Sequence, residues 1–152
     1  MLVVKVLLVT TQGGHLAQMM ALRPWWSVHE RRWVSAPTLD AQHKLVGEQV
    51  TWAHHPTTRN IPNLLRNLML ARRELKGYRP DVIVSTGAGV AVPFFWLART
   101  VKAKTVFIEV LDRVDSRTMS GRLCYPASDL FLAQWEEQAA LWPKATVVGR
   151  LM

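Results

Sequence analysis

The stretch that most constrains the fold runs from residue 7 to residue 19, where an apolar run ends in two threonines and a Gly-Gly pair. The segment from Leu2 to Val9 is apolar except for Lys5, and an apolar segment with helical spacing follows the glycines. This pattern predicts a buried parallel strand that turns into a helix. Gly13 and Gly14 permit a tight turn, and amides at the start of the next helix are suited to hold phosphates or other anions.

His15 falls in the first turn of that expected helix and should face a crevice at the carboxyl edge of the sheet. The alternative is an ordinary strand-to-helix turn with an incidental histidine. The segment matches neither G-x-G-x-x-G nor G-x-x-x-x-G-K-[ST], so the sequence does not favour a dinucleotide or a nucleoside triphosphate as the ligand.

The length of the chain predicts a single domain, because 152 residues suffice for one hydrophobic core. With 49% hydrophobic and 20% charged residues, the composition is that of a globular chain and excludes disorder. Cys124 is the only cysteine, so we expect no disulfide and no thiolate metal site, and a reducing compartment fits. The first ten residues are too short to span a bilayer and are interpreted as a core strand rather than a signal peptide or an anchor.

The net charge of +8 is concentrated in the first half of the chain. Residues 1–80 contain 11 Lys and Arg against 4 Asp and Glu, whereas residues 81–152 contain 8 against 7. Nucleic acid and an anionic membrane surface are the usual partners of a basic surface. The sequence has no RNA-binding or helix-turn-helix signature. We therefore expect a membrane surface and no nucleic acid as a partner, and keep a nucleic-acid-binding α/β protein as an alternative to test.

Strands and helices alternate along the chain, which predicts an α/β fold with a doubly wound parallel sheet and helices on both faces. The expected strands lie at 2–9, 31–35, 49–54, 81–85, 104–110, 129–135 and 146–149. The expected helices lie at 16–23, 40–46, 60–77, 90–101 and 136–142, with a short helix before residue 129. We expect Pro24 to end the first helix and Trp25 and Trp26 to lie in a loop, where they cap the core or enter a lipid interface.

The segment from Asn60 to Gly77 predicts a long helix that has Pro62 in its first turn and ends at Gly77. Its apolar surface is wider than one buried stripe needs, and basic residues surround that surface. Such a helix suits contact with an anionic membrane. The expected contact residues are Arg66, Leu68, Met69, Arg72 and Arg73. The alternative is a core helix with a solvated basic face.

Polar and glycine-rich segments follow several of the expected strands and should meet at one carboxyl edge. The candidates gathered at this edge for holding a diphosphate are Gln12, Gly13, Gly14, Ser85, Thr86, Gly87, Gly89, Arg113 and Gln134. Two glycine turns that open helices can hold a diphosphate through backbone amides. His15 and Glu109 are the candidates for removing a proton from a hydroxyl, and Arg113 is a candidate partner of Glu109 or of a phosphate. Each of these residues also has a purely structural interpretation.

No metal site and no cofactor are predicted from the sequence. His54 and His55 have no cysteine or carboxylate nearby at ligand spacing, and no carboxylate pair follows a strand at such a spacing.

Five segments carry a resemblance to a known family. They are 11–19 (TQGGHLAQM), 85–89 (STGAG), 107–114 (FIEVLDRV), 116–121 (SRTMSG) and 129–135 (DLFLAQW). In these segments the chain resembles the accessory subunit of the two-component UDP-N-acetylglucosamine transferase of asparagine-linked glycosylation. It is more similar still to the bacterial polysaccharide-biosynthesis proteins of that family, found in capsule and exopolysaccharide clusters. The similarity covers essentially the whole chain in order.

The resemblance implies the Rossmann-like, acceptor-side N-terminal half of a GT-B glycosyltransferase, related to the peptidoglycan N-acetylglucosaminyltransferase. It implies a hexosyltransferase subunit that is inactive alone. With a donor-binding partner chain, this subunit of a split inverting glycosyltransferase would transfer a sugar from a UDP-sugar to a polyprenyl-diphosphate-linked saccharide. The expected location is the cytoplasmic side, peripheral on the inner face of the cell membrane.

Two departures from the family pattern bear on these expectations. We expect no N-terminal membrane anchor such as the eukaryotic subunit carries, and residues 1–152 should form one domain that stops where a fused protein would continue into its donor domain. Val110 stands where the family often has a small residue after the Ile-Glu pair. The alternative from another class is a non-catalytic membrane scaffold that recruits and activates a complete glycosyltransferase.

Overall fold

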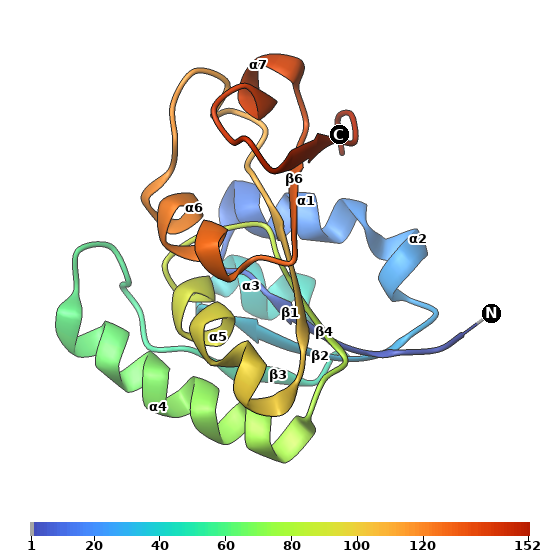
Figure 1. Ribbon diagram of the computed structural model, residues 1–152. Coiled ribbons are helices and arrows are strands. Elements are labelled where there is room, and N and C mark those ends of the chain that lie inside the picture. Colours follow the sequence, from blue (N-terminus) through green and yellow to red (C-terminus); the bar gives the residue numbers. More distant parts are fainter. Residues whose placement is uncertain (1) are drawn as a thin grey trace.

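The computed structural model describes residues 2–152 and contains one parallel sheet (Figure 1). Its strands are β1 (Lys5–Val9), β2 (Glu30–Ser35), β3 (Val50–Trp52), β4 (Val82–Ser85), β5 (Lys104–Ile108), β6 (Leu130–Ala133) and β7 (Ala145–Val147). They lie in the order β3-β2-β1-β4-β5-β6-β7, and every neighbouring pair is parallel. The chain therefore adds β2 and β3 on one side of β1 and then β4 to β7 on the other side, which confirms the predicted Rossmann-like, doubly wound fold.

Helices connect successive strands. They are α1 (Gly13–Ala21), α2 (Arg23–Trp26), α3 (Leu39–Lys44), α4 (Ile61–Tyr78), α5 (Ala91–Leu97), α6 (Met119–Cys124) and α7 (Glu136–Ala139), with 3₁₀ turns η1 (Ala98–Val101) and η2 (Tyr125–Ala127). Two apolar cores show which face each helix covers. Buried residues of α1, α2 and α3 pack with Val6 and Leu8 of β1, whereas those of α4, α5 and α6 pack with Leu7 and Val9. The alternating side chains of one strand thus serve both faces, as expected of a parallel sheet covered on both sides.

The segment after α1 differs from the prediction. Pro24 does not end the first helix, because α1 already ends at Ala21 and Pro24 occupies the first turn of the new helix α2. A proline is tolerated there since its missing N–H would have no partner in the first turn. Trp25 and Trp26 are therefore helical rather than in a loop, and only Trp26 is buried.

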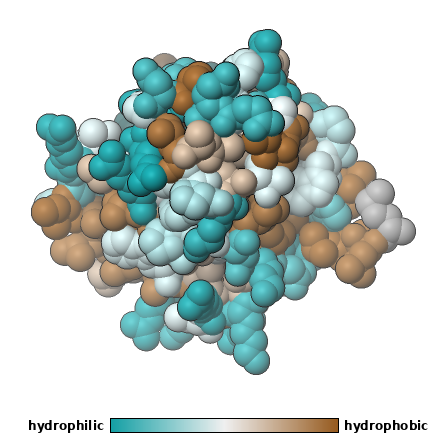
Figure 2. Space-filling model, turned by 45° about the horizontal axis from the view of Figure 1, so that its top comes forward, coloured by the Kyte–Doolittle hydropathy of each residue, from teal (hydrophilic) through white to brown (hydrophobic). Residues whose placement is uncertain are grey.

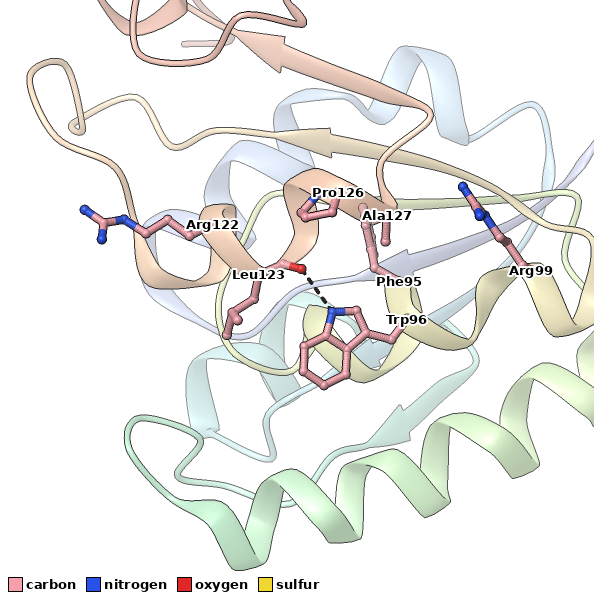
Figure 3. A pocket seen from close by; sticks show the side chains of 7 residues that line it. All are labelled: Phe95, Trp96, Arg99, Arg122, Leu123, Pro126 and Ala127. Atoms are coloured by element: carbon pink, nitrogen blue, oxygen red, sulfur yellow. Dashed lines mark hydrogen bonds between the residues drawn. The ribbon is translucent and has the colours of Figure 1, made fainter.

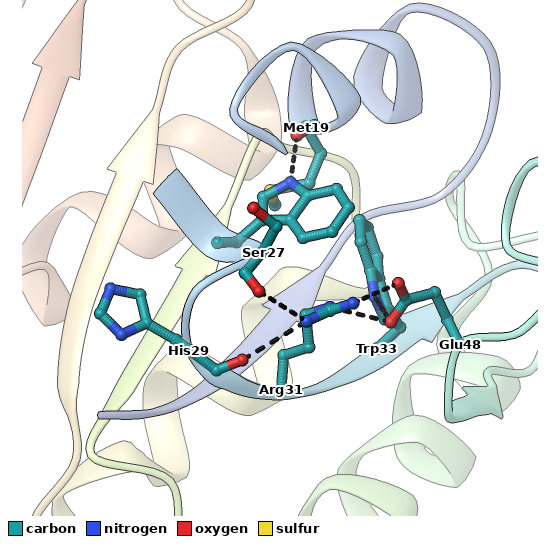
Figure 4. Close-up of polar contacts among 7 residues, drawn as sticks. Met19, Ser27, His29, Arg31, Trp33 and Glu48 are labelled. Atoms are coloured by element: carbon teal, nitrogen blue, oxygen red, sulfur yellow. Dashed lines mark hydrogen bonds and ion pairs between the residues drawn. The ribbon is translucent and has the colours of Figure 1, made fainter. Parts of the chain in front are cut away.

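Trp26 anchors α2 against the sheet through its indole ring. Its Nε1 donates to the carbonyl of Met19 at 2.9 Å, and its ring meets that of Trp33 edge-to-face at 5.2 Å. Arg31 stacks over Trp26 and donates two hydrogen bonds to the carboxylate of Glu48, which also accepts from Trp33 Nε1 (Figure 4). A bidentate arginine pair of this kind fixes geometry as well as adding energy, so this polar group ties the start of β2 to the turn before β3.

The long helix α4 is confirmed, but its end is not where the sequence placed it. The side chain of Asn60 caps its first turn by accepting from the Asn63 amide. The helix runs past Gly77 to Tyr78, and Arg79 takes the left-handed conformation that closes it, with φ of 51°. Arg79 can adopt this costly conformation because its amide bonds the carbonyl of Leu75 and completes the helix end.

Several strands are shorter than the sequence predicted. β1 begins at Lys5 rather than Leu2, whose side chain is exposed, and β5 ends at Ile108 rather than at residue 110. The end of a strand is decided by its pairing with the neighbouring strands. The apolar pattern alone therefore does not show where a strand begins or ends. The shorter β5 places Glu109 just beyond the sheet, in the loop that leads toward α6.

Candidate functional site

The carboxyl ends of β1, β4 and β5 adjoin, because these strands are neighbours in the sheet. The turns that follow them start at Thr10, Thr86 and Glu109. This edge is therefore the place where the structure brings the predicted segments together, as expected for ligand sites of open α/β sheets.

The first glycine turn opens α1 and carries exposed backbone. Gly13 has φ of 56°, a left-handed conformation that glycine adopts without strain. Its amide donates to the carboxylate of Asp40 on α3 at 3.1 Å. The pKa of Asp40 lies below its ordinary value, chiefly because Lys44 donates a hydrogen bond to it and also because the Gly13 amide does. Within residues 2–152, no acceptor bonds the amides of Gly14 and His15, and these amides remain open to a ligand.

His15 and Thr86 join the first glycine turn to the second through reciprocal hydrogen bonds. His15 Nδ1 lies 2.9 Å from the carbonyl oxygen of Thr86, and Thr86 Oγ1 donates to the carbonyl of His15 at 2.6 Å. A carbonyl oxygen can only accept, so Nδ1 carries the hydrogen in this contact. The neutral ring then has an unprotonated Nε2, which can accept a proton from a substrate.

The second glycine turn is shaped around the imidazole ring. A Cβ at Gly87, where φ is 113°, would lie 3.0 Å from His15 Nδ1 and Cε1. A larger residue would therefore displace the ring. Ser85 Oγ accepts from the Gly87 amide at 3.1 Å, and Thr86 is buried with its hydroxyl near that of Thr10. Ser85 and Thr86 thus hold the turn in shape, while Gly89 is half-buried at its outer side.

Glu109 does not lie as the sequence suggested. Its side chain has no exposed surface and accepts from Thr118 Oγ1, at 3.1 and 3.0 Å from the two carboxylate oxygens, and from the Val110 amide. Of the two candidate partners of Arg113, Glu109 forms no ion pair with it in the described residues, because the Arg113 side chain instead donates to Ser116 at 3.3 Å. Burial raises the pKa of the Glu109 carboxyl, against the lowering effect of the Val110 and Thr118 hydrogen bonds.

The role of Thr118 explains why Glu109 is turned inward. Thr118 caps α6, since its Oγ1 accepts from the Gly121 amide at 3.0 Å while donating to Glu109. A Cβ at Gly121 would lie 2.7 Å from Glu109 Oε2, so a glycine is required for the close approach. Glu109 therefore fixes the start of α6 in this structure.

Gln134 is buried in a network of glutamines rather than open to a ligand. Its Nε2 donates to the carbonyl of Glu109 and to Gln18 Oε1, and its Oε1 accepts from the Leu151 amide. Gln138 completes the network by donating to two carbonyls of the loop after β5. Sequence reasoning missed Gln18 and Gln138, and the only signal was their placement on the inner side of short amphipathic helices. The network joins α1, α7 and the loops after β5 and β6.

The outer surface of α4 combines apolar and basic side chains. Ile61, Leu65 and Met69 are 69%, 56% and 75% exposed, at a spacing of four residues. Arg66, Arg72 and Arg73 are exposed beside or beyond this stripe, whereas Leu68 is half-buried and contributes less than predicted. Figure 2 shows apolar surface at its left edge, the side on which Figure 1 places the start of α4. No helix in the described part of the chain is long and apolar enough to cross a bilayer.

A groove of about 410 Å³ lies apart from the glycine turns, between α5 and α6 (Figure 3). Trp96 forms its floor and donates from Nε1 to the carbonyl of Leu123 at 3.0 Å. Arg99 and Arg122 lie toward its two ends. The groove contains none of the predicted site residues, so this groove and the edge formed by the glycine turns are different places.

Comparison with known proteins identifies the family. The sequence model of the family described as "Oligosaccharide biosynthesis protein Alg14 like" matches residues 46–151. The chain belongs to the Alg14-like family. The chain is 33% identical over 122 residues to the UDP-N-acetylglucosamine transferase subunit ALG14 of Eremothecium gossypii, covering 76% of this chain and 53% of that protein. It is 28% identical over 94 residues to the human protein of the same name, covering 58% of this chain and 44% of that one.

Solved structures agree with the fold of this Alg14-like chain. MurG of Acinetobacter baumannii superposes with a TM-score of 0.73 at 15% identity, covering 88% of this chain and 42% of that one. The UDP-GlcNAc 2-epimerase of Methanocaldococcus jannaschii gives 0.74 at 16% identity, covering 96% and 45%. At these identities the likeness shows the GT-B-type Rossmann-like fold alone. The chain spans about half the length of the curated relatives it matches.

The buried carboxyl of Glu109 predicts a pH dependence of stability. The pKa of Glu109 is raised in the folded chain above its ordinary value of 4.5. The folded state therefore keeps a proton that the unfolded state has lost, and stability falls as pH rises from 4.5 through the raised pKa. Glu109→Gln should remove this decline. Between pH 4.5 and the raised pKa, the decline in the free energy of unfolding is at most about 1.4 kcal/mol per pH unit.

Urea unfolding of wild type and Glu109→Gln across the acidic and neutral range measures this effect. Glu137→Gln, which removes an exposed carboxylate of α7, serves as the control for loss of one acid. If the stability difference between wild type and Glu109→Gln does not change with pH, the carboxyl is not buried as described.

Proposed function

We propose that the chain is the acceptor-side subunit of a split inverting glycosyltransferase. A donor-binding partner chain holds a UDP-sugar, and the acceptor is a polyprenyl-diphosphate-linked saccharide. The observation that carries the proposal is the ring of His15, which lies between the two glycine turns and whose Nε2 has no hydrogen-bond partner within residues 2–152. Membership of the Alg14-like family and the names of relatives as UDP-N-acetylglucosamine transferase subunits support UDP-N-acetylglucosamine as the donor.

In the proposed reaction, His15 acts as the general base. An acceptor hydroxyl attacks the anomeric carbon of the donor sugar, and its proton passes to Nε2 of His15. The new glycosidic C–O bond forms as the bond to the UDP oxygen breaks, and UDP leaves with the bonding electrons. The Thr86 carbonyl holds the Nδ1–H and orients the ring, which is how a base is kept in its productive tautomer.

The glycine turns would hold the acceptor diphosphate. The open amides of Gly14 and His15 lie at the start of α1, and the exposed side chain of Gln12 lies beside them. The Gly87–Gly89 turn faces the same edge, where Arg113 can supply a positive charge from the loop after β5. Ser85 and Thr86 hold the turn in shape rather than bind the diphosphate themselves. Gln134 is not among the proposed diphosphate ligands, because its amide is bonded to Gln18, Glu109 and Leu151 within the fold.

The partner chain would supply the half that binds the nucleotide. Relatives carry the word subunit in their names, and this supports a division of labour between two chains. We further propose that the reaction belongs to polysaccharide assembly on a lipid carrier, as the resemblance of segments such as residues 11–19 and 85–89 implies.

The outer surface of α4 would bind the inner face of the cell membrane peripherally. Ile61, Leu65 and Met69 would enter the headgroup region while arginines pair with anionic lipids. Each basic residue near an anionic surface contributes about 1 kcal/mol, so several together suffice for reversible attachment. This location brings the glycine turns to the lipid-linked acceptor.

One observation favours a second candidate, a non-catalytic scaffold that recruits and activates a complete glycosyltransferase. Glu109 and Gln134, two of the residues assigned to the site by sequence, are buried and hold the fold. If His15 is structural as well, neither of the two candidate bases is placed to react.

Substitution of His15 separates the two candidates. In the complex purified from native cells through a tag on this chain, His15→Ala should lower transfer from UDP-N-acetylglucosamine to a polyprenyl-diphosphate acceptor about 10²- to 10⁴-fold, the usual loss for a general base. The measurement is initial rate per mole of intact complex.

His29→Ala is the matched control, because it removes an imidazole that accepts from the Val4 amide and packs against the Trp25 ring, before β2 and outside the two glycine turns. A scaffold keeps its turnover when His15 is replaced, so a rate within a few-fold of wild type contradicts the catalytic proposal. A comparable loss in Glu109→Gln, with an unchanged melting temperature, would transfer the base role to Glu109.

Charge reversal on α4 tests the membrane contact. The triple variant Arg66→Glu, Arg72→Glu and Arg73→Glu should lose at least about 3 kcal/mol of attraction, or about a hundredfold in binding to anionic vesicles. Sedimentation with phosphatidylglycerol-containing vesicles measures the bound fraction.

The control carries the same change of charge elsewhere, at the exposed residues Lys102, Lys104 and Arg150. Equal binding by wild type and the α4 variant would show that this helix is not the membrane contact.

A further inference from the structure

The first half of α4 presents two different surfaces. Ile61, Leu65 and Met69 point outward and are exposed, whereas Asn63 and Asn67 are buried on the opposite side. Buried amides are costly unless they are hydrogen-bonded, so the partners of the two asparagines show what this side of the helix holds.

Both asparagines bind the backbone of the loop between β3 and α4. Asn67 Oδ1 accepts from the His54 amide at 2.8 Å, and its Nδ2 donates to the His54 carbonyl at 3.0 Å. Asn63 Nδ2 donates to the carbonyl of Pro56 at 2.8 Å. These bonds tie residues 54–60, which we call the β3–α4 loop, to the inner face of the helix.

The β3–α4 loop in turn contacts the second glycine turn. A Cβ at Gly89 would lie 3.1 Å from Cβ and Oγ1 of Thr57, so the loop packs closely against this turn. At Gly87, two residues earlier, an added Cβ would lie 3.0 Å from atoms of the His15 ring, so this residue packs closely against the ring. An unbroken series of contacts therefore runs from α4 through the loop and the turn to the imidazole.

We propose that Asn63 and Asn67 are positioning residues that couple contact of α4 with a bilayer to the shape of the second glycine turn. The inference rests on the proposed function, in which α4 binds the membrane and the turn binds the acceptor. The acceptor site is then held in its binding shape when the chain lies on the surface that carries its lipid-linked substrate.

The physical basis is local opening of the helix start. Helix ends and loops open with small free energies, and opening of the first two turns of α4 would release the two asparagines and the loop together. A bilayer that holds Ile61, Leu65 and Met69 binds the closed helix better than the open one. Membrane binding therefore lowers the population of the open state of the helix start, and with it that of the β3–α4 loop and the second glycine turn.

Hydrogen–deuterium exchange of the full chain, with and without vesicles of phosphatidylcholine and phosphatidylglycerol, tests the coupling. Peptides that cover residues 53–60 and begin at least two residues earlier report on the His54 amide that Asn67 holds, and peptides that likewise cover 86–92 report on the turn. In wild type, vesicles should slow exchange in both at least about fivefold, the lower end of typical coupling between sites. In Asn67→Ala, vesicle binding and protection of the outer α4 residues should persist while both effects disappear.

The matched control is Glu74→Ala on the same helix. Glu74 accepts from Thr51 Oγ1 and pairs with Arg32, so it ties α4 to β3 and β2 without touching the loop. This variant should respond to vesicles as wild type does. Thr57→Gly, which keeps both asparagines, should retain the slowing at 53–60 and lose it at 86–92, and it tests the coupling even if Asn67→Ala does not fold.

The outcomes that contradict the proposal are distinct. Vesicle binding by wild type with unchanged exchange at 53–60 overturns the coupling and leaves the membrane contact standing. Equal slowing in wild type, Asn67→Ala and Thr57→Gly overturns it as well. Absence of vesicle binding by wild type overturns the membrane contact itself, and the coupling with it.

Discussion

The paired hydrogen bonds between His15 and Thr86 join the turns after β1 and β4, and the arrangement of the carboxyl edge depends on this joint. Because β1 and β4 are neighbours at the point where the strand order reverses, no further strand separates the two turns. The carbonyl of Thr86 sets the tautomer of the ring, and the missing side chain of Gly87 leaves room for it. These two hydrogen bonds thus join the glycine turns and orient the imidazole ring between them.

Burial decides which polar residues near this edge can react with a ligand. Glu109 and Gln134 stand at the ends of β5 and β6, but their polar atoms are bonded to the fold, and removing either from its partners would leave buried groups unsatisfied. His15 uses one nitrogen for its support and keeps the other. The two faces of α4 are divided in the same way. The asparagines on its inner face hold a loop, whereas its exposed outer face remains available for the proposed membrane contact.

Periodicity and turn residues were sufficient to predict the alternating fold, because buried parallel strands are apolar throughout and glycines mark the turns. The same signals placed His15 and the glycine turns at one edge. They did not predict that Glu109 turns inward, because its partner Thr118 lies nine residues later and becomes a helix cap only in the folded chain. Nor did they reveal Asn63 and Asn67 as loop-binding residues, since an asparagine in an amphipathic helix carries no mark of its long-range partner.

We propose that this chain supplies the acceptor side of a reaction whose nucleotide side belongs to another chain. The most direct measurement compares transfer from radiolabelled UDP-N-acetylglucosamine to a polyprenyl-diphosphate-linked saccharide by the purified chain and by its complex with the native partner. The account predicts no product from the chain alone and transfer by the complex. Turnover by the isolated chain, free of any partner, would contradict it.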